Sequence, residues 1–402
     1  ILRSVSFLAL PVTHPDELFI TTDLDEEYVD ATLEIQGKIE GETIGTSLEI
    51  KLISPNNQEL SLENESLLLD GNEFKMKNVI HEVMKWDAEH PNLYKLKISL
   101  LKDSEVLWSD WYNVGFREIE IDGNVFKVNG KPVNLRGACR HDIHPTLGRV
   151  STPEYDLKDV LLAKEANMNF IRTSHYPCTD YFLDLCDQYG IYVEDEAAIC
   201  FVGTNRTPDF LPDTTVNDTA YTDRFPSAIG EMIINHHNHP SVIIWSTGNE
   251  SEFGINTMKS FELAKKLDQT RPVIFSYPGY VPNSVYNFDI VSIHYPDITG
   301  YREQIGYEVD NFDDPDKPVL FDEWLHVPAY NEKTLLVDQN VRDFWGISID
   351  SMWQRSFETP GSMGGAIWGM IDETFMMPED LEGFNDWWGI NFGRTLPGEY
   401  SG

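Results

Sequence analysis

Carboxylates, imidazoles, guanidinium groups and aromatic rings recur at or just after the ends of short apolar segments between residues 133 and 370. In chain order they are Arg136, Arg140, His141, His144, Arg172, His175, Tyr176, Asp195, Glu196, Asn249, Glu250, His294, Tyr295, Asp322, Glu323, Trp324, His326 and Trp368. Such groups are costly in a protein core unless they are paired. They suit a pocket that binds a polyhydroxylated, ring-shaped ligand through hydrogen bonds and apolar ring faces.

Glu250 and Glu323 are the strongest candidates for catalysis. Hydrolysis of a glycosidic bond needs one carboxyl that protonates the leaving oxygen and a second that stays ionised across the sugar ring. A separation near 5 Å implies a covalent intermediate and retention, and roughly 6.5–9.5 Å implies a water and inversion. The sequence leaves this separation open. The structural alternative is a pair of exposed carboxylates among the 67 acidic residues of the chain.

The elements that must position these residues follow a regular alternation after Gly115. Amphipathic helical segments such as 155–167, 179–190 and 255–268 fit between most of the apolar strand candidates, which are 133–138, 169–174, 191–196, 242–247, 272–277, 289–295, 318–324 and 364–370. Eight such units in about 270 residues predict a (β/α)8 TIM barrel, in which functional residues gather at the C-terminal strand ends. The fourth and seventh strands lie across the barrel mouth, so Glu250 and Glu323 should face each other. The alternative, an open doubly wound sheet, would need a glycine-rich phosphate turn, and RGACRHDIHP is not one.

The N-terminal part of the chain predicts a different fold. Five segments alternate apolar and polar residues and are separated by turn clusters: 17–24, 29–39, 46–54, 93–101 and 105–116. We therefore expect an immunoglobulin-like β-sandwich over 17–116, without catalytic residues, followed by the barrel over 117–402. The segment VFKVNGKPVNL predicts a hairpin that turns at Asn129 and Gly130.

Composition excludes several classes of function. The chain of 402 residues has 30 basic and 67 acidic groups, and a net charge of −37 repels both nucleic-acid phosphates and anionic lipid. No apolar run approaches the ~18 residues that a membrane span requires. The four cysteines, Cys139, Cys178, Cys186 and Cys200, have neither metal-ligand spacing nor the number for a disulfide framework. They leave the compartment open between export and the cytoplasm.

Several long motifs, in the correct order and spacing, resemble glycoside hydrolase family 2, and RHDIHP and SHYP resemble its β-galactosidase branch. The motifs are WDAEHPNLY, VGFREIEI, VNGKPVNLRGACRHDIHP, RTSHYP, LCDQYGIYVEDEA and INHHNHPSVIIWSTGNES. This resemblance implies a retaining mechanism in which Glu250 is the general acid/base and Glu323 is the nucleophile. It also implies that Asn249 binds the sugar 2-hydroxyl and that Arg172 and Tyr295 hold Glu323.

The resemblance gives further residues a place in the pocket. His141 and His175 would contact sugar hydroxyls, while His326 and Trp368 would line the pocket. Two of these residues have a structural alternative: Arg172 could form a buried structural ion pair, and Trp368 could belong to the core.

The sequence also departs from the family pattern. Magnesium-dependent members carry Glu and His where this chain has Cys200 and Val202, so we expect no metal beside Glu250 and no cofactor. The neighbour of the nucleophile is Trp324 where the branch has Tyr. Relatives begin with a jelly-roll sugar-binding domain, so residues 1–16 resemble the end of that domain. The last residues resemble the loop that precedes the final barrel helix.

The resulting hypothesis is an exo-acting retaining β-glycosidase that acts on a β-linked oligosaccharide or glycoside, most simply a β-galactosidase. A β-glucuronidase should read the uronate with a cation, and residues 369–386 contain no Lys or Arg. A β-mannosidase stays open, because recognition of the 2-hydroxyl depends on pocket geometry. The hypothesis from another class is a carbohydrate-binding remnant without turnover. The oligomeric state also stays open, with a homo-oligomer as one option.

Overall fold

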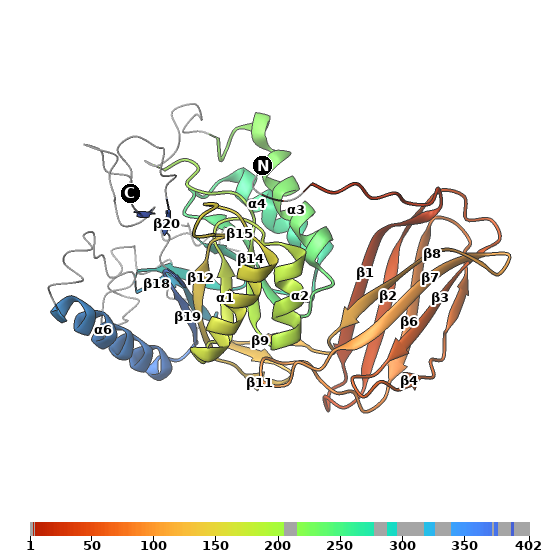
Figure 1. The fold of residues 1–402 in the computed structure, drawn as a ribbon, viewed down its shortest axis with the longest axis horizontal. Helices are drawn as coiled ribbons and strands as arrows, with labels where there is room; N and C mark the ends of the chain where they lie inside the picture. Colours follow the sequence, from red (N-terminus) through yellow and green to blue (C-terminus); the bar gives the residue numbers. More distant parts are fainter. Residues whose placement is uncertain are drawn as a thin grey trace.

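The computed structural model describes residues 3, 5–204, 215–276, 288–295, 317–325, 339–371, 374–376 and 387–389. A strand-rich N-terminal domain is followed by a barrel with helices on its outside (Figure 1). The predicted combination of a β-sandwich and a TIM barrel is confirmed.

The sandwich consists of antiparallel strands in two sheets. One sheet has the order β1 (His14–Leu24), β2 (Ala31–Glu40), β6 (Glu73–Ile80), and the other has the order β4 (Glu59–Leu60), β3 (Thr46–Ile53), β7 (Tyr94–Lys102), β8 (Glu105–Val114), with β5 (Ser66–Leu68) paired to β3. Buried and exposed residues alternate strictly along β6, as expected for a strand with one face in the core. Strand β6 was not among the five predicted strands. The immunoglobulin-like topology stays a prediction.

A small sheet connects the sandwich to the barrel. It consists of β9 (Ile119–Asp122), β10 (Val125–Val128) and β11 (Lys131–Pro132). Asn129 and Gly130 form the turn between β10 and β11 with φ values of 53° and 73°. Two successive positive φ angles are what a tight hairpin turn of this kind requires, so the predicted hairpin is confirmed.

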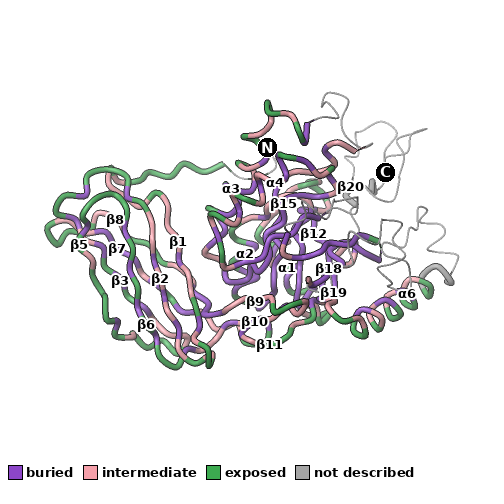
Figure 2. Tube along the Cα trace, turned by 180° about the vertical axis from the view of Figure 1, so that it is seen from behind, coloured by how far each residue is buried: buried purple, intermediate pink, exposed green. Residues whose placement is uncertain are grey.

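All eight predicted barrel strands are present. Around the parallel sheet they are β16 (Val273–Ser276), β15 (Val242–Asn249), β14 (Tyr192–Glu196), β13 (Phe170–Thr173), β12 (Leu135–Arg140), β19 (Ser362–Ile367), β18 (Val319–Trp324) and β17 (Val291–His294). A parallel bridge between Ile274 and Ile290 joins the two ends of this path, which excludes the open doubly wound alternative. The barrel strands are almost entirely buried (Figure 2).

The helices of the described chain lie outside the barrel (Figure 1). They are α1 (Pro153–Glu165), α2 (Asp180–Tyr189), α3 (Arg224–His236), α4 (Ile255–Leu267), α6 (Gln339–Glu358) and the short 3-10 helix η1 (Thr219–Tyr221). A short pair of strands, β20 (Thr374–Met376) and β21 (Trp387–Gly389), completes the described elements. None of the helices described is both long and apolar enough to span a membrane.

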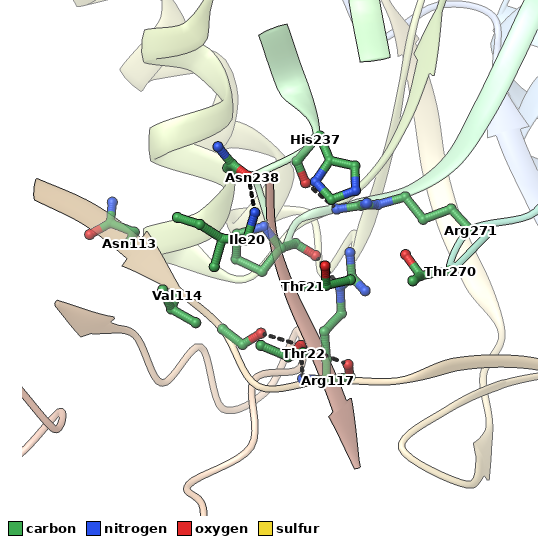
Figure 3. A pocket seen from close by; sticks show the side chains of 12 residues that line it. Ile20, Thr21, Thr22, Asn113, Val114, Arg117, His237, Asn238, Thr270 and Arg271 are labelled. Atoms are coloured by element: carbon green, nitrogen blue, oxygen red, sulfur yellow. Dashed lines mark hydrogen bonds between the residues drawn. The ribbon is translucent and has the colours of Figure 1, made fainter. Parts of the chain in front are cut away.

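Buried polar contacts join the sandwich to the barrel. Arg117 donates to the carbonyl oxygens of Pro240 and Val242 at 2.6 and 2.9 Å, and Trp86 donates its indole N–H to Asp187 O at 2.9 Å. Between the two domains lies a small cavity of about 20 Å³, lined by residues that include Ile20, Thr22, Asn238 and Arg271 (Figure 3). A space of this size holds no more than about one water molecule, so it is not a sugar-binding pocket.

Candidate active site

Eight of the nine predicted site residues lie in the described part of the chain, and all eight come together at the C-terminal ends of the barrel strands. They are His141, Arg172, His175, Asn249, Glu250, Tyr295, Glu323 and Trp368. His326 falls outside the described residues. The eight come from β12, β13, β15, β17, β18 and β19 or from the residues just after these strands. Closure of the barrel therefore assembles a site from residues that are up to 227 positions apart in the sequence.

The backbone turns sharply where two of these strands end. Gly248 has φ 141°, and a Cβ at this position would lie 2.4 Å from the carbonyl oxygen of Ile199. Only glycine fits there, immediately before Asn249 and Glu250. Glu250 and Tyr295 have φ values of 37° and 43°, which non-glycine residues adopt rarely and mostly at functional sites.

Arg172 is the hub of the site and is fully buried. Its Nη1 donates to Glu323 Oε2 at 2.8 Å, and its Nη2 donates to Glu196 Oε2 and to Asn249 Oδ1, both at 2.7 Å. Nε contacts Glu196 Oε2 at 3.0 Å and Nη1 also reaches Asp322 O at 3.2 Å. Burial opposes the charge on Arg172, but the surrounding carboxylates outweigh it and raise the pKa of the guanidinium. A planar group with five donors thus fixes three side chains at once.

Glu323 is held on both carboxylate oxygens. Arg172 binds Oε2, and the Tyr295 hydroxyl donates to Oε1. Burial and the charge of Glu323 raise the pKa of Tyr295, so its hydroxyl keeps the proton that it donates. His175 Nε2 lies 3.9 Å from Oε2. Hydrogen bonds from charged and neutral donors stabilise an ionised carboxylate and fix its orientation.

Glu250 contacts a residue to which the sequence assigned no role, His294. His294 Nδ1 lies 3.0 Å from Glu250 Oε1, at hydrogen-bond distance, and 3.9 Å from Glu323 Oε2. One carboxylate oxygen of Glu250 and one of Glu323 lie within 4.8 Å of each other. On its other side, His294 Nε2 is 3.6 Å from Asp322 Oδ2 and 3.1 Å from Ser276 Oγ. The strand-end position of His294 was visible in the sequence, but these contacts depend on how β15, β16, β17 and β18 meet.

An aromatic wall lies beside the carboxylates. The ring of His175 stacks on the Trp368 indole, with 5.1 Å between centroids and 6° between planes. His141 meets the same indole edge-on at 5.3 Å and contacts the Tyr176 hydroxyl at 3.3 Å. Burial lowers the pKa values of both imidazoles well below the ordinary value, so both rings are neutral at pH 7. One indole face is thus covered by His175, and a sugar can reach only the other face or the edge.

Three of the strand-end residues point away from this site. Asp195 binds His236 on α3, and Trp324 packs against Trp353 of α6. The guanidinium of Arg140 is buried in an ion-pair network with three aspartates, Asp142, Asp156 and Asp159. Alternate residues of a strand face opposite sides, so strand-end position alone does not place a side chain in the mouth of the barrel. Glu196, by contrast, contacts both Arg172 and His175 and was not among the predicted site residues.

Cys200 and Val202 supply no oxygen or nitrogen ligand for a metal ion beside Asn249. Cys200 Sγ accepts from Asn249 Nδ2 at 3.5 Å, and burial raises its pKa to about 12, so it is a thiol. Val202 is buried among apolar side chains. Two groups of described residues bring three ligand-type atoms together: Glu250, His294 and Glu323, of which Glu323 already binds Arg172 and Tyr295, and Asp184, Asp187 and His239 from α2 and the residues just after α3. The expected absence of a metal and of a cofactor stays a prediction.

Solved structures with the same fold include two β-glucuronidases. The Bacteroides uniformis beta-glucuronidase is 25% identical, with a TM-score of 0.73 over 91% of this chain and 48% of that chain. The beta-glucuronidase of Parabacteroides merdae, at 22% identity, has a TM-score of 0.74 over 93% of this chain and 49% of that chain. At this level of identity the second likeness shows the fold alone.

Sequence comparisons give closer relatives. Beta-galactosidases of Photobacterium profundum and Vibrio vulnificus are 32% and 33% identical over 413 aligned positions, which cover 98% of this chain and 38% of each relative. The chain thus spans less than two-fifths of the length of these relatives. Residues 119–335 match the TIM barrel domain of glycosyl hydrolases family 2, and residues 13–117 match a second model of the same family. The chain belongs to glycosyl hydrolase family 2.

Proposed function

We propose that this chain carries the active site of a retaining, exo-acting β-glycosidase that removes terminal non-reducing β-D-galactosyl residues. The observation that carries the proposal is the gap of at most 4.8 Å between carboxylate oxygens of Glu250 and Glu323. Retaining enzymes place their two carboxyl groups about 5–5.5 Å apart, whereas inverting enzymes need about 6.5–9.5 Å to admit a water. The gap therefore favours double displacement.

In the first step, a Glu323 oxygen would bond to the anomeric carbon as the glycosidic C–O bond breaks, and the proton of Glu250 would pass to the leaving oxygen. In the second step, Glu250 as carboxylate would take a proton from water. The water oxygen would bond to the anomeric carbon as the ester bond to Glu323 breaks. Both carboxyl groups then regain their starting states.

The other residues would act on the sugar or on the nucleophile. Arg172 and Tyr295 would keep Glu323 ionised and aimed at the anomeric carbon. Asn249, whose amide is fixed by Arg172, would bind the 2-hydroxyl in a contact that strengthens in the transition state. We propose that His141, His175, Trp368 and His326 line the pocket and contact hydroxyls and the apolar ring face.

The choice of sugar rests on similarity. The β-galactosidase relatives favour galactose, and the B. uniformis β-glucuronidase favours a second candidate, a glucuronide. The lack of Lys and Arg in residues 369–386 argues against a uronate there. A β-mannosidase stays a third candidate, because recognition of the 2-hydroxyl depends on pocket geometry, and the experiment below separates the three.

The test is incubation of the protein, in the longest form that its gene encodes, with activated aryl 2-deoxy-2-fluoro-β-glycosides of galactose, glucuronic acid and mannose. Intact mass and peptide mapping then locate any adduct. We expect a stable adduct on Glu323 with the galactoside. An adduct with another sugar would replace galactose as the proposed substrate. An adduct on another carboxylate would overturn the assignment of Glu323 as the nucleophile.

Two variants sharpen this experiment. Glu323→Gln should form no adduct, whereas Glu252→Gln, which changes an exposed glutamate two residues from Glu250, should react like the parent protein. If the parent protein binds sugars but forms no adduct and releases no aglycone, the chain is a carbohydrate-binding remnant and the proposal is wrong.

A further inference from the structure

We propose that His294 is a positioning residue of this reaction, whose positively charged ring orients Glu250 and balances the negative charge that Glu250 and Glu323 share. The inference rests on the proposed function, because it assigns the acid/base and nucleophile roles to these two glutamates. It adds a positively charged group beside both glutamates.

The geometry places His294 between the two glutamates and a buried aspartate. Its side chain is fully buried. Nδ1 faces Glu250 and Glu323 at 3.0 and 3.9 Å, and Nε2 faces Asp322 at 3.6 Å. With carboxylates on both sides, a ring that is protonated on both nitrogens can donate in both directions, whereas a neutral ring can donate in only one.

Asp322 is held as the fixed counter-charge. Ser292 Oγ donates to its Oδ1 at 2.6 Å, and Ser276 Oγ donates to its Oδ2. Although burial opposes ionisation, the positive charge of His294 and these donors lower the pKa of Asp322 to about 2. Burial likewise opposes the charge on His294, but Asp322 and Glu323 outweigh it and raise its pKa to about 10. The ring is therefore an imidazolium through the neutral range.

No second cation competes for this role among the described residues that face the ring. The titratable and charged groups around it are Arg172 and His175 from β13 and its end, Glu194 from β14, Glu250 after β15, Tyr295 after β17, and Asp322 and Glu323 from β18. Arg172 is engaged by Glu196, Asn249 and Glu323. Burial lowers the pKa of His175 and raises that of Glu194.

The position of the charge suits both steps of the reaction. Before the first step Glu323 carries the negative charge, and in the covalent intermediate Glu323 is a neutral ester while Glu250 is ionised. The His294 ring contacts one of these groups at 3.0 Å and the other at 3.9 Å, so it is beside the charged carboxylate in either state. It stabilises the ionised form of Glu250 more strongly, because that contact is shorter.

The test compares His294→Asn with the parent protein, because asparagine can still donate to Glu250 but carries no charge. The readout is the pH profile of kcat/KM, measured on two substrates. The first has a poor leaving group that must be protonated by Glu250, and the second has an activated leaving group that needs no protonation. We expect the alkaline limb to move up by about one pH unit or more on the first substrate.

His90→Asn is the matched control, since His90 is an exposed histidine of the sandwich. It should leave both limbs unchanged. If His294→Asn folds and forms the Glu323 adduct but its alkaline limb coincides with that of the parent protein, the inference is wrong and the proposed function stands. If the parent protein forms no adduct, both are overturned.

A second measurement needs no variant, in case position 294 does not tolerate asparagine. The parent protein with ¹⁵N-labelled histidine is observed by NMR at pH 8, before and after trapping with the fluoro sugar. Among the rings perturbed by the adduct, one should carry protons on both nitrogens, while the buried rings of His141 and His175 are neutral. If every perturbed ring is neutral, the inference is overturned.

Discussion

Replacement of Arg172 by lysine should separate positioning of the nucleophile from simple stability. The guanidinium uses Nη1 for Glu323, Nη2 for Asn249 and both Nε and Nη2 for Glu196. A lysine ammonium has three donors on one nitrogen at the end of a flexible chain. It can keep the charge and one carboxylate, but it cannot reach all three side chains.

The magnitude follows from the bonds that are lost. A hydrogen bond to a charged group contributes about 1.5–3 kcal/mol. If the lysine stays with Glu196, the bond to Glu323 is lost, and kcat/KM should fall by about 10- to 150-fold. Stability should fall as well. The free energy of unfolding should decrease by ~1–3 kcal/mol, because the buried Asn249 oxygen loses its donor.

The assay measures kcat/KM and thermal unfolding for Arg172→Lys and for Arg271→Lys. Arg271 is also buried and binds Asp268 and the carbonyl of Val242, at the start of β15 and so at the opposite end of the strand from Glu250. The control should lose stability but keep kcat/KM per folded molecule within about twofold. The reasoning is refuted if Arg172→Lys keeps the parent kcat/KM, or if Arg271→Lys loses as much activity as Arg172→Lys.

Further predictions concern the hydroxyl donor, a buried acid and a glycine. Tyr295→Phe should lower kcat/KM about tenfold or more, because the Glu323 carboxylate loses a hydrogen-bond donor that orients it. Glu194 is buried without a hydrogen-bond partner for either oxygen among the described residues, and burial raises its pKa well above 4.5. The folded state thus binds this proton more tightly than the unfolded state, and the free energy of unfolding falls as pH rises above about 4.5. Glu194→Gln should therefore raise the melting temperature more at pH 8 than at pH 4.5. An equal change at both pH values would contradict this expectation. Gly248→Ala should destabilise the protein and abolish activity, because the new Cβ would lie 2.4 Å from a backbone oxygen. Gly346→Ala is the control, since Gly346 occupies an exposed position of α6 with open space around it. Thermal unfolding should show that this variant is more stable by about 0.5–1 kcal/mol.

The sequence predicted the elements well because their signals are local. The apolar segments that became β12 to β19 are bounded by polar and turn residues, and Asn129 with Gly130 specifies its hairpin through positive φ angles. Strand β6 was missed although its residues alternate, because it follows a turn cluster and four of its eight residues are polar.

Candidate site residues were predictable where a motif or a strand end marked them. Glu250, Glu323, Arg172 and Asn249 share that signal, and the barrel topology brings the strand ends together. Asp195 and Glu196 share it too, yet only Glu196 contacts the site, because adjacent residues of a strand face opposite sides. Side-chain direction at the last residue of a strand depends on where the backbone leaves the sheet.

What the sequence determined by itself was therefore the set of elements, their order and the chemical groups at their ends, since propensity and periodicity act over a few neighbouring residues. The tertiary structure alone decided the distances: the gap between the two glutamates, the three partners of Arg172, and the place of His294 between Glu250 and Asp322. These depend on the closure of eight strands around one axis. The ionisation of buried groups follows from these distances, because it is the charges within a few ångströms that outweigh the cost of burial.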